Sequence, residues 1–271
     1  MKLKIGKVTC SVNKKGKSSS KNIILFLHGF AGSSKDWTEV ISHLPKNNFI
    51  VTIDLIGHGK SSSPKNKMYY NEKALITQLF SVIKKTASKN INLIGYSLGG
   101  RLALSFSIKY PKIIKTLILE SSTAGLTKKN ERKRKRIMDK FLSNKLKKDG
   151  IKKFIHYWFE QPLFKNLKKH KNYKNLINKR LKNNKFGISN ILTEFSQGKM
   201  KSMWSAIKHI ETPMLLITGE KDRKYKKINS RMAKKLQKAK HVSIKNAGHN
   251  THFEKPKLFA NFVEKFLNSQ K

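Results

Sequence analysis

Residues 91–101 read I-N-L-I-G-Y-S-L-G-G-R, an apolar run that leads into a serine set between glycines. The apolar run is typical of a strand buried on both faces, and residues 98–109 after the serine are typical of a helix. A G-x-S-x-G motif in this setting predicts a sharp strand-to-helix turn that exposes the serine hydroxyl as a nucleophile. Ser97 is therefore the first candidate catalytic residue.

Apolar runs of the same kind occur on both sides of this turn, at 23–27, 49–54, 114–120, 214–219 and 241–245. Segments with a helical pattern lie between them, near 71–88, 98–109, 228–238 and 256–268. This alternation predicts an α/β fold with a mostly parallel, doubly wound sheet and helices on both of its faces.

The strand pattern stops between 126 and 204, where the sequence becomes helical and rich in lysine, and it resumes at Pro213. An insertion over the sheet explains this interruption. We therefore expect a core made of residues 1–125 and 205–271, and a helical cap made of residues 126–204.

The chain carries 60 Lys and Arg against 15 Asp and Glu, which gives a formal net charge of +45. A polyanionic partner would explain this charge, but the lysines are spread through every segment and no nucleic-acid-binding module is recognisable. We favour a general enrichment of lysine on the surface. We therefore expect no specific nucleic-acid partner, only salt-sensitive adsorption.

Cys10 is the only cysteine, so no intrachain disulfide can form. The N-terminal stretch lacks the apolar segment of a signal peptide, and no apolar run reaches the roughly 18 residues of a membrane span. These features predict a cytoplasmic protein without membrane insertion, as a monomer or a small homo-oligomer.

A catalytic serine needs a histidine base and a carboxylate that orients it. Asp222 follows the predicted strand 214–219, and His249 follows the strand 241–245, which places both at the carboxyl edge of the sheet. Glu220 and His252 are their rivals in the same loops. We predict a triad of Ser97, Asp222 and His249.

An oxyanion formed in the reaction needs hydrogen-bond donors. L-H-G-F at 27–30 ends another strand, so the backbone N–H of Phe30 can point toward the serine beside that of Leu98, which opens a helix. His28 and His58, in contrast, are expected to be structural residues of their turns.

Arg101 lies four residues after Ser97 and therefore on the same face of the predicted helix. A buried guanidinium is costly without an anion beside it. An acidic substrate would supply that anion, and an ion pair with a cap carboxylate such as Glu131 or Glu160 is an equally good explanation.

Five motifs resemble the α/β-hydrolase superfamily in order and spacing: H-G-F, D-x-x-G-H-G-x-S, G-Y-S-L-G-G, G-E-K-D and A-G-H-N. This superfamily includes esterases, C–C hydrolases, lyases and non-enzymatic receptors, so its fold does not define a substrate. An ordinary serine hydrolase acting on an acidic small molecule remains the alternative function, and a binding protein without activity is a third.

Longer stretches resemble the MenH family, the 2-succinyl-6-hydroxy-2,4-cyclohexadiene-1-carboxylate synthases. They include the predicted cap and are G-Y-S-L-G-G-R, L-E-S-S-T-A-G-L, the E-R run that ends at Asp139, W-F-E-Q-P-L-F, L-T-E-F-S-Q-G-K-M-K-S-M-W, and A-G-H-N-T-H-F-E-K-P. The resemblance implies a lyase of menaquinone biosynthesis that eliminates pyruvate from a tricarboxylate, 2-succinyl-5-enolpyruvyl-6-hydroxy-3-cyclohexene-1-carboxylate. The serine would act as a base, with no acyl-enzyme.

The same resemblance implies that the substrate is bound by Tyr96, Arg101, Trp158 and Arg180. Within the E-R run it implies arginines at Arg132 and Arg136, with Lys135 competing for the second role. No metal and no cofactor are implied.

Overall fold

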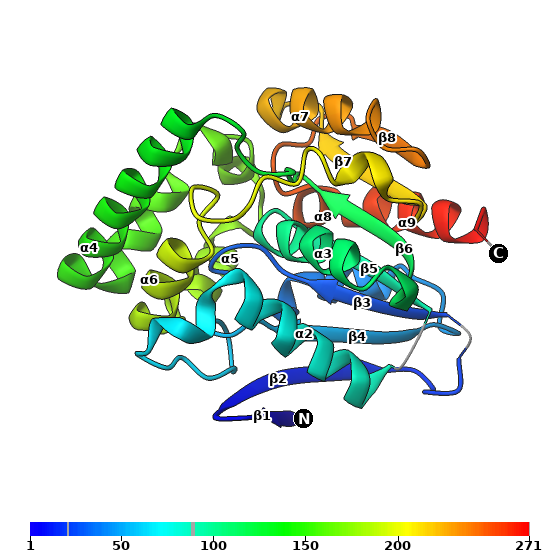
Figure 1. Ribbon diagram of the computed structural model, residues 1–271, viewed down its shortest axis with the longest axis horizontal. Coiled ribbons are helices and arrows are strands. Elements are labelled where there is room, and N and C mark those ends of the chain that lie inside the picture. Colours follow the sequence, from blue (N-terminus) through cyan, green and yellow to red (C-terminus); the bar gives the residue numbers. More distant parts are fainter. Residues whose placement is uncertain (21, 88–89, 271) are drawn as a thin grey trace.

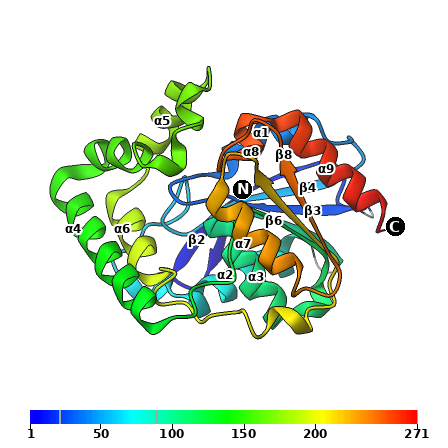
Figure 2. The same cartoon turned by 90° about the horizontal axis from the view of Figure 1, so that it is seen from above.

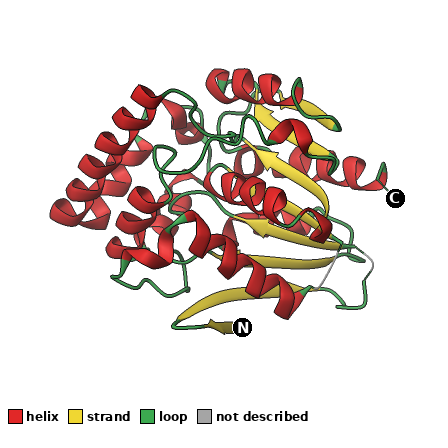
Figure 3. Cartoon of the chain, in the orientation of Figure 1, coloured by secondary structure: helices red, strands yellow, loops and turns green. Residues whose placement is uncertain are grey.

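The computed structural model of the protein describes residues 1–20, 22–87 and 90–270. An eight-stranded sheet in the order β1-β2-β4-β3-β5-β6-β7-β8 forms its centre (Figures 1 and 3). The six strands from β4 to β8 in this order run parallel to one another, whereas β2 runs antiparallel to both of its neighbours, β1 and β4. The strands are β1 Lys2–Ile5, β2 Val8–Lys15, β3 Ile23–Leu27, β4 Phe49–Asp54, β5 Ile91–Tyr96, β6 Ile114–Glu120, β7 Met214–Gly219 and β8 Ala239–Ile244.

All six strands expected from the apolar runs are present, and β3, β4, β6 and β7 have the expected bounds. The central strands are buried along their whole length, which explains why their sequences show no alternation. The N-terminal hairpin of β1 and β2 adds an edge to the sheet. In β2 the alternating residues Val8, Cys10 and Val12 are buried in the core.

Helices cover both faces of the sheet, and each face has its own apolar cluster. The first face carries α2 (Glu72–Thr86), α3 (Leu98–Lys109) and α7 (Arg223–Ala233). The second carries α1 (Thr38–Ser42), α8 (Thr251–Glu254) and α9 (Pro256–Asn268). The doubly wound α/β architecture predicted from the sequence is therefore confirmed.

Two expected helices differ from those observed. The helix predicted near 228–238 is α7, which begins five residues earlier because the carboxylate of Asp222 accepts the amide of Tyr225 and so caps its first turn. The helix predicted near 71–88 is α2, which ends at Thr86, and residue 88 lies outside the described residues.

Three helices lie between β6 and β7 in the sequence. They are α4 (Lys129–Phe159), interrupted by a non-helical Gly150 at φ 80°, α5 (Tyr173–Leu181) and α6 (Lys185–Glu194). They share a third apolar cluster, to which Ala31 and Phe30 of the β3 loop contribute. Both views show them at one end of the sheet (Figures 1 and 2). Their separation as a cap domain stays a prediction.

A buried ion pair fastens α5 to the loop that follows β3. Arg180 donates from both terminal nitrogens to Asp36, at 2.7 and 2.8 Å, and the two side chains are only 4% and 5% exposed. Burial alone would raise the pKa of Asp36, but the charge and hydrogen bonds of Arg180 outweigh it and hold that pKa below its ordinary value. The pair therefore favours the ionised carboxylate.

We predict that Asp36→Asn lowers the free energy of unfolding by about 3 kcal/mol at pH 7, because it leaves the Arg180 charge buried without an anion. A lowered native pKa stabilises the fold above the unfolded pKa of about 3.9, and this contribution disappears as the pH falls through the native value. Urea unfolding between pH 7 and pH 3 therefore shows a difference between the two proteins that shrinks in acid.

The exposed pair of Lys168 and Glu160 is the control. Glu160→Gln is expected to change stability by less than about 1 kcal/mol, since exposed ion pairs contribute little. Equal effects of the two substitutions would contradict a special role for the Asp36–Arg180 pair.

Candidate active site

Ser97 occupies a strained turn between β5 and α3. Its φ of 49° and ψ of −101° lie in a region that few residues other than glycine adopt. The crowding around it requires glycines: a Cβ on Gly99 would lie 2.4 Å from the carbonyl oxygen of Leu27, and one on Gly95 would lie 2.5 Å from that of Gly99. The turn that the G-x-S-x-G motif predicts is therefore present.

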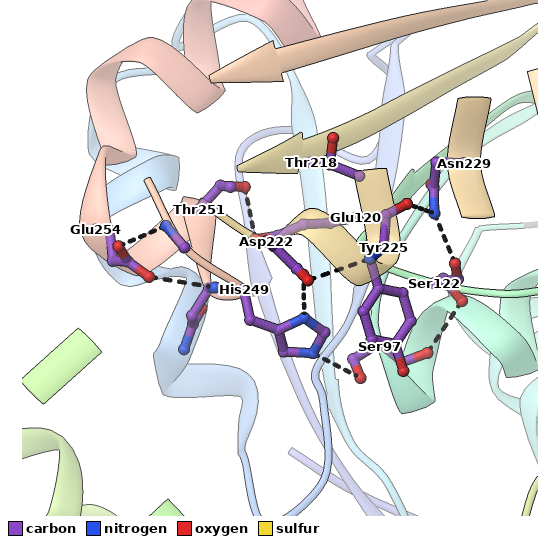
Figure 4. A network of polar contacts seen from close by, with 12 residues as sticks. Ser97, Glu120, Ser122, Thr218, Asp222, Tyr225, Asn229, His249, Thr251 and Glu254 are labelled. Carbon is purple, nitrogen blue, oxygen red and sulfur yellow. Dashed lines mark hydrogen bonds and ion pairs between the residues drawn. The ribbon is translucent and has the colours of Figure 1, made fainter. Parts of the chain in front are cut away.

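Two hydrogen bonds connect Ser97 to His249 and His249 to Asp222 (Figure 4). His249 Nε2 is 3.3 Å from Ser97 Oγ, and His249 Nδ1 is 2.6 Å from a carboxylate oxygen of Asp222. This geometry keeps one imidazole nitrogen facing the hydroxyl and the other facing the carboxylate, as a proton relay requires.

Glu220 and His252, the alternative candidates for the triad, form other hydrogen bonds. Glu220 accepts the amide of Asn246, and His252 Nδ1 bonds to Glu120 at 2.7 Å. Both side chains of this second pair are almost completely buried. The structure therefore brings Asp222 and His249 to Ser97, and not Glu220 or His252.

Two buried glutamates hold the loop that carries His249 (Figure 4). Glu120, at the end of β6, accepts the hydroxyl of Thr251 at 2.7 Å and the amide of His252 at 3.0 Å. Glu254 accepts the amide of Gly248 at 2.8 Å, and burial raises its pKa. Sequence reasoning missed both glutamates, although Glu120 ends a predicted strand at the working edge of the sheet. They fix the backbone on both sides of His249.

The residues expected to supply the oxyanion donors, Phe30 and Leu98, border a pocket that also contains Ser97 and His249. Phe30 and Leu98 both line it, and the Leu98 amide is one of the N–H groups that an α-helix leaves without an internal partner. His28 is a structural residue, as expected: its Nε2 accepts the amide of Leu55 and its Nδ1 donates to the carbonyl of Gly29. Burial also lowers the pKa values of His28 and His58, so both are held neutral.

The pocket above Ser97 has a volume of about 180 Å³. Aromatic side chains form much of its wall, among them Phe30, Trp158 and Phe164. Four cationic side chains also line it: Arg101, Lys135, Arg180 and Lys224. A small pocket with apolar walls and several cations suits a compact anionic molecule.

Arg101 lines this pocket and forms no ion pair within the described part of the chain, although the carboxylate of Asp139 is also in the lining, where it pairs with Lys135. Its side chain donates to the carbonyl of Phe195 at 2.8 Å and lies over the Phe195 ring at 4.8 Å. Among the residues that the structure describes, no carboxylate lies within ion-pair distance of it, so neither Glu131 nor Glu160 is its partner. Burial lowers the pKa of its guanidinium.

Of the other residues expected to bind substrate, Tyr96, Trp158 and Arg180 line the pocket and Arg132 and Arg136 do not. These two arginines lie four apart on the face of α4 that packs against the 198–200 loop, and they donate to carbonyl oxygens of Gly198 and Met200. Lys135, which competed with them, points into the pocket instead and pairs with Asp139. Neighbouring positions on a helix face different directions, so Lys135 lines the pocket and Arg136 does not.

Several pocket residues were not identified from the sequence. Lys224 and Tyr225 lie in the first turn of α7, and Gln161, Gln197 and Asn250 lie in connecting segments. Lys224 could have been found from its place two residues after Asp222, had the start of the helix been predicted correctly. Within the described residues, no group of three or more His, Cys, Asp or Glu side chains is arranged to hold a metal ion.

Comparisons with known proteins agree with this geometry. The family model of the alpha/beta hydrolase fold matches residues 22–256. A Bacillus subtilis (strain 168) protein, provisionally named 2-succinyl-6-hydroxy-2,4-cyclohexadiene-1-carboxylate synthase, is 36% identical over 97% of this chain and 96% of its own length. The synthase of that name from Photorhabdus laumondii is 28% identical over 90% of this chain and 85% of its own length.

The solved structure of MenH from S. aureus superimposes with a TM-score of 0.91 at 28% identity, over 96% of this chain and 98% of that one. A thermophilic esterase from Thermogutta terrifontis has a TM-score of 0.86 at 18% identity, which shows the fold alone. In the described part of the chain, no helix is long and apolar enough to cross a membrane. The protein belongs to the alpha/beta-hydrolase fold and, within it, to the MenH family of 2-succinyl-6-hydroxy-2,4-cyclohexadiene-1-carboxylate synthases.

Proposed function

We propose that the protein is a lyase of menaquinone biosynthesis that converts 2-succinyl-5-enolpyruvyl-6-hydroxy-3-cyclohexene-1-carboxylate to 2-succinyl-6-hydroxy-2,4-cyclohexadiene-1-carboxylate and pyruvate. Membership of the MenH family supports this activity. The observation that carries the substrate assignment is Arg101, a buried cation beside Ser97 with no carboxylate in contact among the described residues. A substrate carboxylate supplies the missing anion.

Ser97 is the proposed base. His249 takes the hydroxyl proton as Ser97 Oγ removes a proton from the substrate ring, and Asp222 stabilises the imidazolium that forms. The electron pair moves onto the succinyl carbonyl, where the amides of Phe30 and Leu98 stabilise the oxyanion. When the negative charge moves back from this oxygen into the ring, the C–O bond to the enolpyruvyl group breaks. The enolpyruvate that leaves takes the proton held by the His249 imidazolium and tautomerises to pyruvate, which returns the histidine to its neutral form. No bond forms between serine and substrate.

In this proposal the four cationic side chains of the pocket bind the three carboxylates of the substrate. Arg101 and Lys224 come from the first turns of α3 and α7, while Lys135 and Arg180 come from α4 and α5. Arg180 is already paired with Asp36, but its buried Nε–H has no partner among the described residues. Aromatic walls keep water away from these contacts, which strengthens each of them.

We predict that the purified protein releases pyruvate from the enolpyruvyl substrate and hydrolyses simple aryl esters slowly or not at all. A coupled lactate dehydrogenase assay follows pyruvate, and absorbance follows the esters. Rapid ester hydrolysis without pyruvate release would favour the serine hydrolase alternative and reject the lyase.

Ser97→Ala is expected to lower kcat by roughly 10²–10⁴-fold, the usual contribution of a general base, with little change in substrate binding. Stopped-flow pyruvate assays and calorimetric binding of the substrate measure the two effects. Retention of full activity would remove Ser97 from the proton transfer.

Arg101→Ala is expected to lower kcat/KM by roughly 10–100-fold, because it removes a charge-assisted contact with a carboxylate. Arg101→Lys recovers part of this loss, since it restores the charge without the two-pronged geometry. The matched control is Arg136→Ala, which removes an arginine of α4 that donates to Gly198 outside the pocket. Equal losses in the two alanine variants would show that Arg101 has no particular role in binding.

A further inference from the structure

A second hollow, of about 590 Å³, lies beside the sheet and is larger than the pocket above Ser97. Five segments border it: β2, β4, the loop after β4 with Gly59 and Lys60, the stretch from Ser33 to Ser42, and α5 with the residues that follow it. Small-molecule sites in proteins usually have volumes of about 300–1,000 Å³, so this hollow, which we call the β2–β4 groove, has the size of a binding site.

The pairing of β2 with β4 forms the floor of the β2–β4 groove. Ser11 lies opposite Asp54, Asn13 opposite Thr52 and Lys15 opposite Ile50, so these side chains share one face of the sheet. The nearby helix α1 has only five residues and ends at Ser42, and the floor residues Ser11, Thr52 and Asp54 are themselves buried. A hollow with a polar floor is the result.

The charge of the β2–β4 groove is strongly positive. Six lysines line it: Lys14, Lys15, Lys35, Lys60, Lys179 and Lys182. Within the described residues, none of the six forms an ion pair. The one carboxylate in the lining, Asp54, already accepts the amides of Ser34 at 2.7 Å and Lys60 at 2.9 Å. Cations gathered around a concave surface attract anions more strongly than the same cations on a flat one.

The remaining lining defines the chemistry of the ligand. Six Ser and Thr side chains are in the lining, of which Thr38 and Ser42 already donate their hydroxyls to backbone carbonyls. Among the described lining residues none is aromatic, so a nucleobase would have no ring to stack on. We propose that the β2–β4 groove binds a small, non-aromatic polyanion that carries two or more phosphate or carboxylate groups. This site is separate from the pocket above Ser97, since the two share no lining residue.

The ligand would join α5 to the sheet. Lys179, Lys182 and Asn183 approach the β2–β4 groove from the α5 side, and Asn183 bonds to the carbonyl of Ala31 at 2.8 Å and to the amide of Gly59 at 3.0 Å. Arg180, between these residues, faces the pocket above Ser97 and pairs with Asp36. A bound polyanion therefore restrains the helix that carries one of the pocket cations.

The test is a calorimetric titration with inorganic pyrophosphate and, separately, with citrate, at constant ionic strength. Two triple variants are compared with the unmodified protein: Lys15→Gln/Lys60→Gln/Lys182→Gln, and a control with the same charge change, Lys147→Gln/Lys152→Gln/Lys234→Gln, at exposed lysines away from the groove. Arg101→Ala is titrated in parallel to identify anion binding in the pocket above Ser97.

We expect saturable binding of at least one probe that weakens roughly tenfold or more in the groove variant and little in the control variant or in Arg101→Ala, because three charge-assisted contacts are lost. The probe that binds distinguishes phosphates from carboxylates. Hydrogen exchange across α5 should slow when that probe is added to the unmodified protein, and not when it is added to the groove variant.

Three results would overturn the proposal. Absence of saturable binding, or equal weakening in the two triple variants, would mean that the lysines attract only a diffuse ion atmosphere. Weakening in Arg101→Ala alone would place the anion above Ser97. None of these measurements uses the lyase reaction, so the result is independent of pyruvate release.

Discussion

The positive φ of Ser97 is the constraint on which the site depends. It is tolerated because Gly95 and Gly99 allow the turn to press against the carbonyl end of β3, where a single added carbon would approach a backbone oxygen to 2.4 Å. This close approach sets the start of α3 beside the loop after β3, so the amides of Leu98 and Phe30 border one pocket. A strained backbone persists only where its surroundings hold it, and here buried strands on both sides of β5 do so.

The buried charged side chains near the pocket have two kinds of surroundings. Asp36 and Arg180 form an ion pair inside the protein, and the buried Glu120 accepts hydrogen bonds from Thr251 and the amide of His252. Arg101 contacts a carbonyl, a thioether and an aromatic ring, and in the described structure it forms no ion pair. A buried guanidinium without an ion-pair partner is costly, and this cost is the physical basis of the proposed acidic substrate.

The sheet was predictable because strands buried on both faces have continuous apolar sequences, and β3, β4, β6 and β7 have the expected bounds. Ser97 and Asp222 were predictable because each follows such a strand, and His249 because it follows the partly exposed edge strand β8. The α4 residues were not, since the helix packs by angular position: Arg132 and Arg136 face the 198–200 loop while Lys135 faces the pocket. The ion pair of Asp36 with Arg180 joins residues 144 apart, and no local pattern identifies such a pair.

The two buried glutamates that hold the His249 loop belong to β6 and α8, so the loop is anchored without any contribution from α4, α5 or α6. Lys135 and Arg180, in contrast, reach the pocket from those helices. Asn166, between α4 and α5, also donates to Glu254. Substitutions within α4, α5 and α6 themselves would therefore change the fit of the proposed anion while the proton relay keeps its geometry. In evolutionary terms, the chemistry and the choice of substrate can diverge at separate rates within one chain.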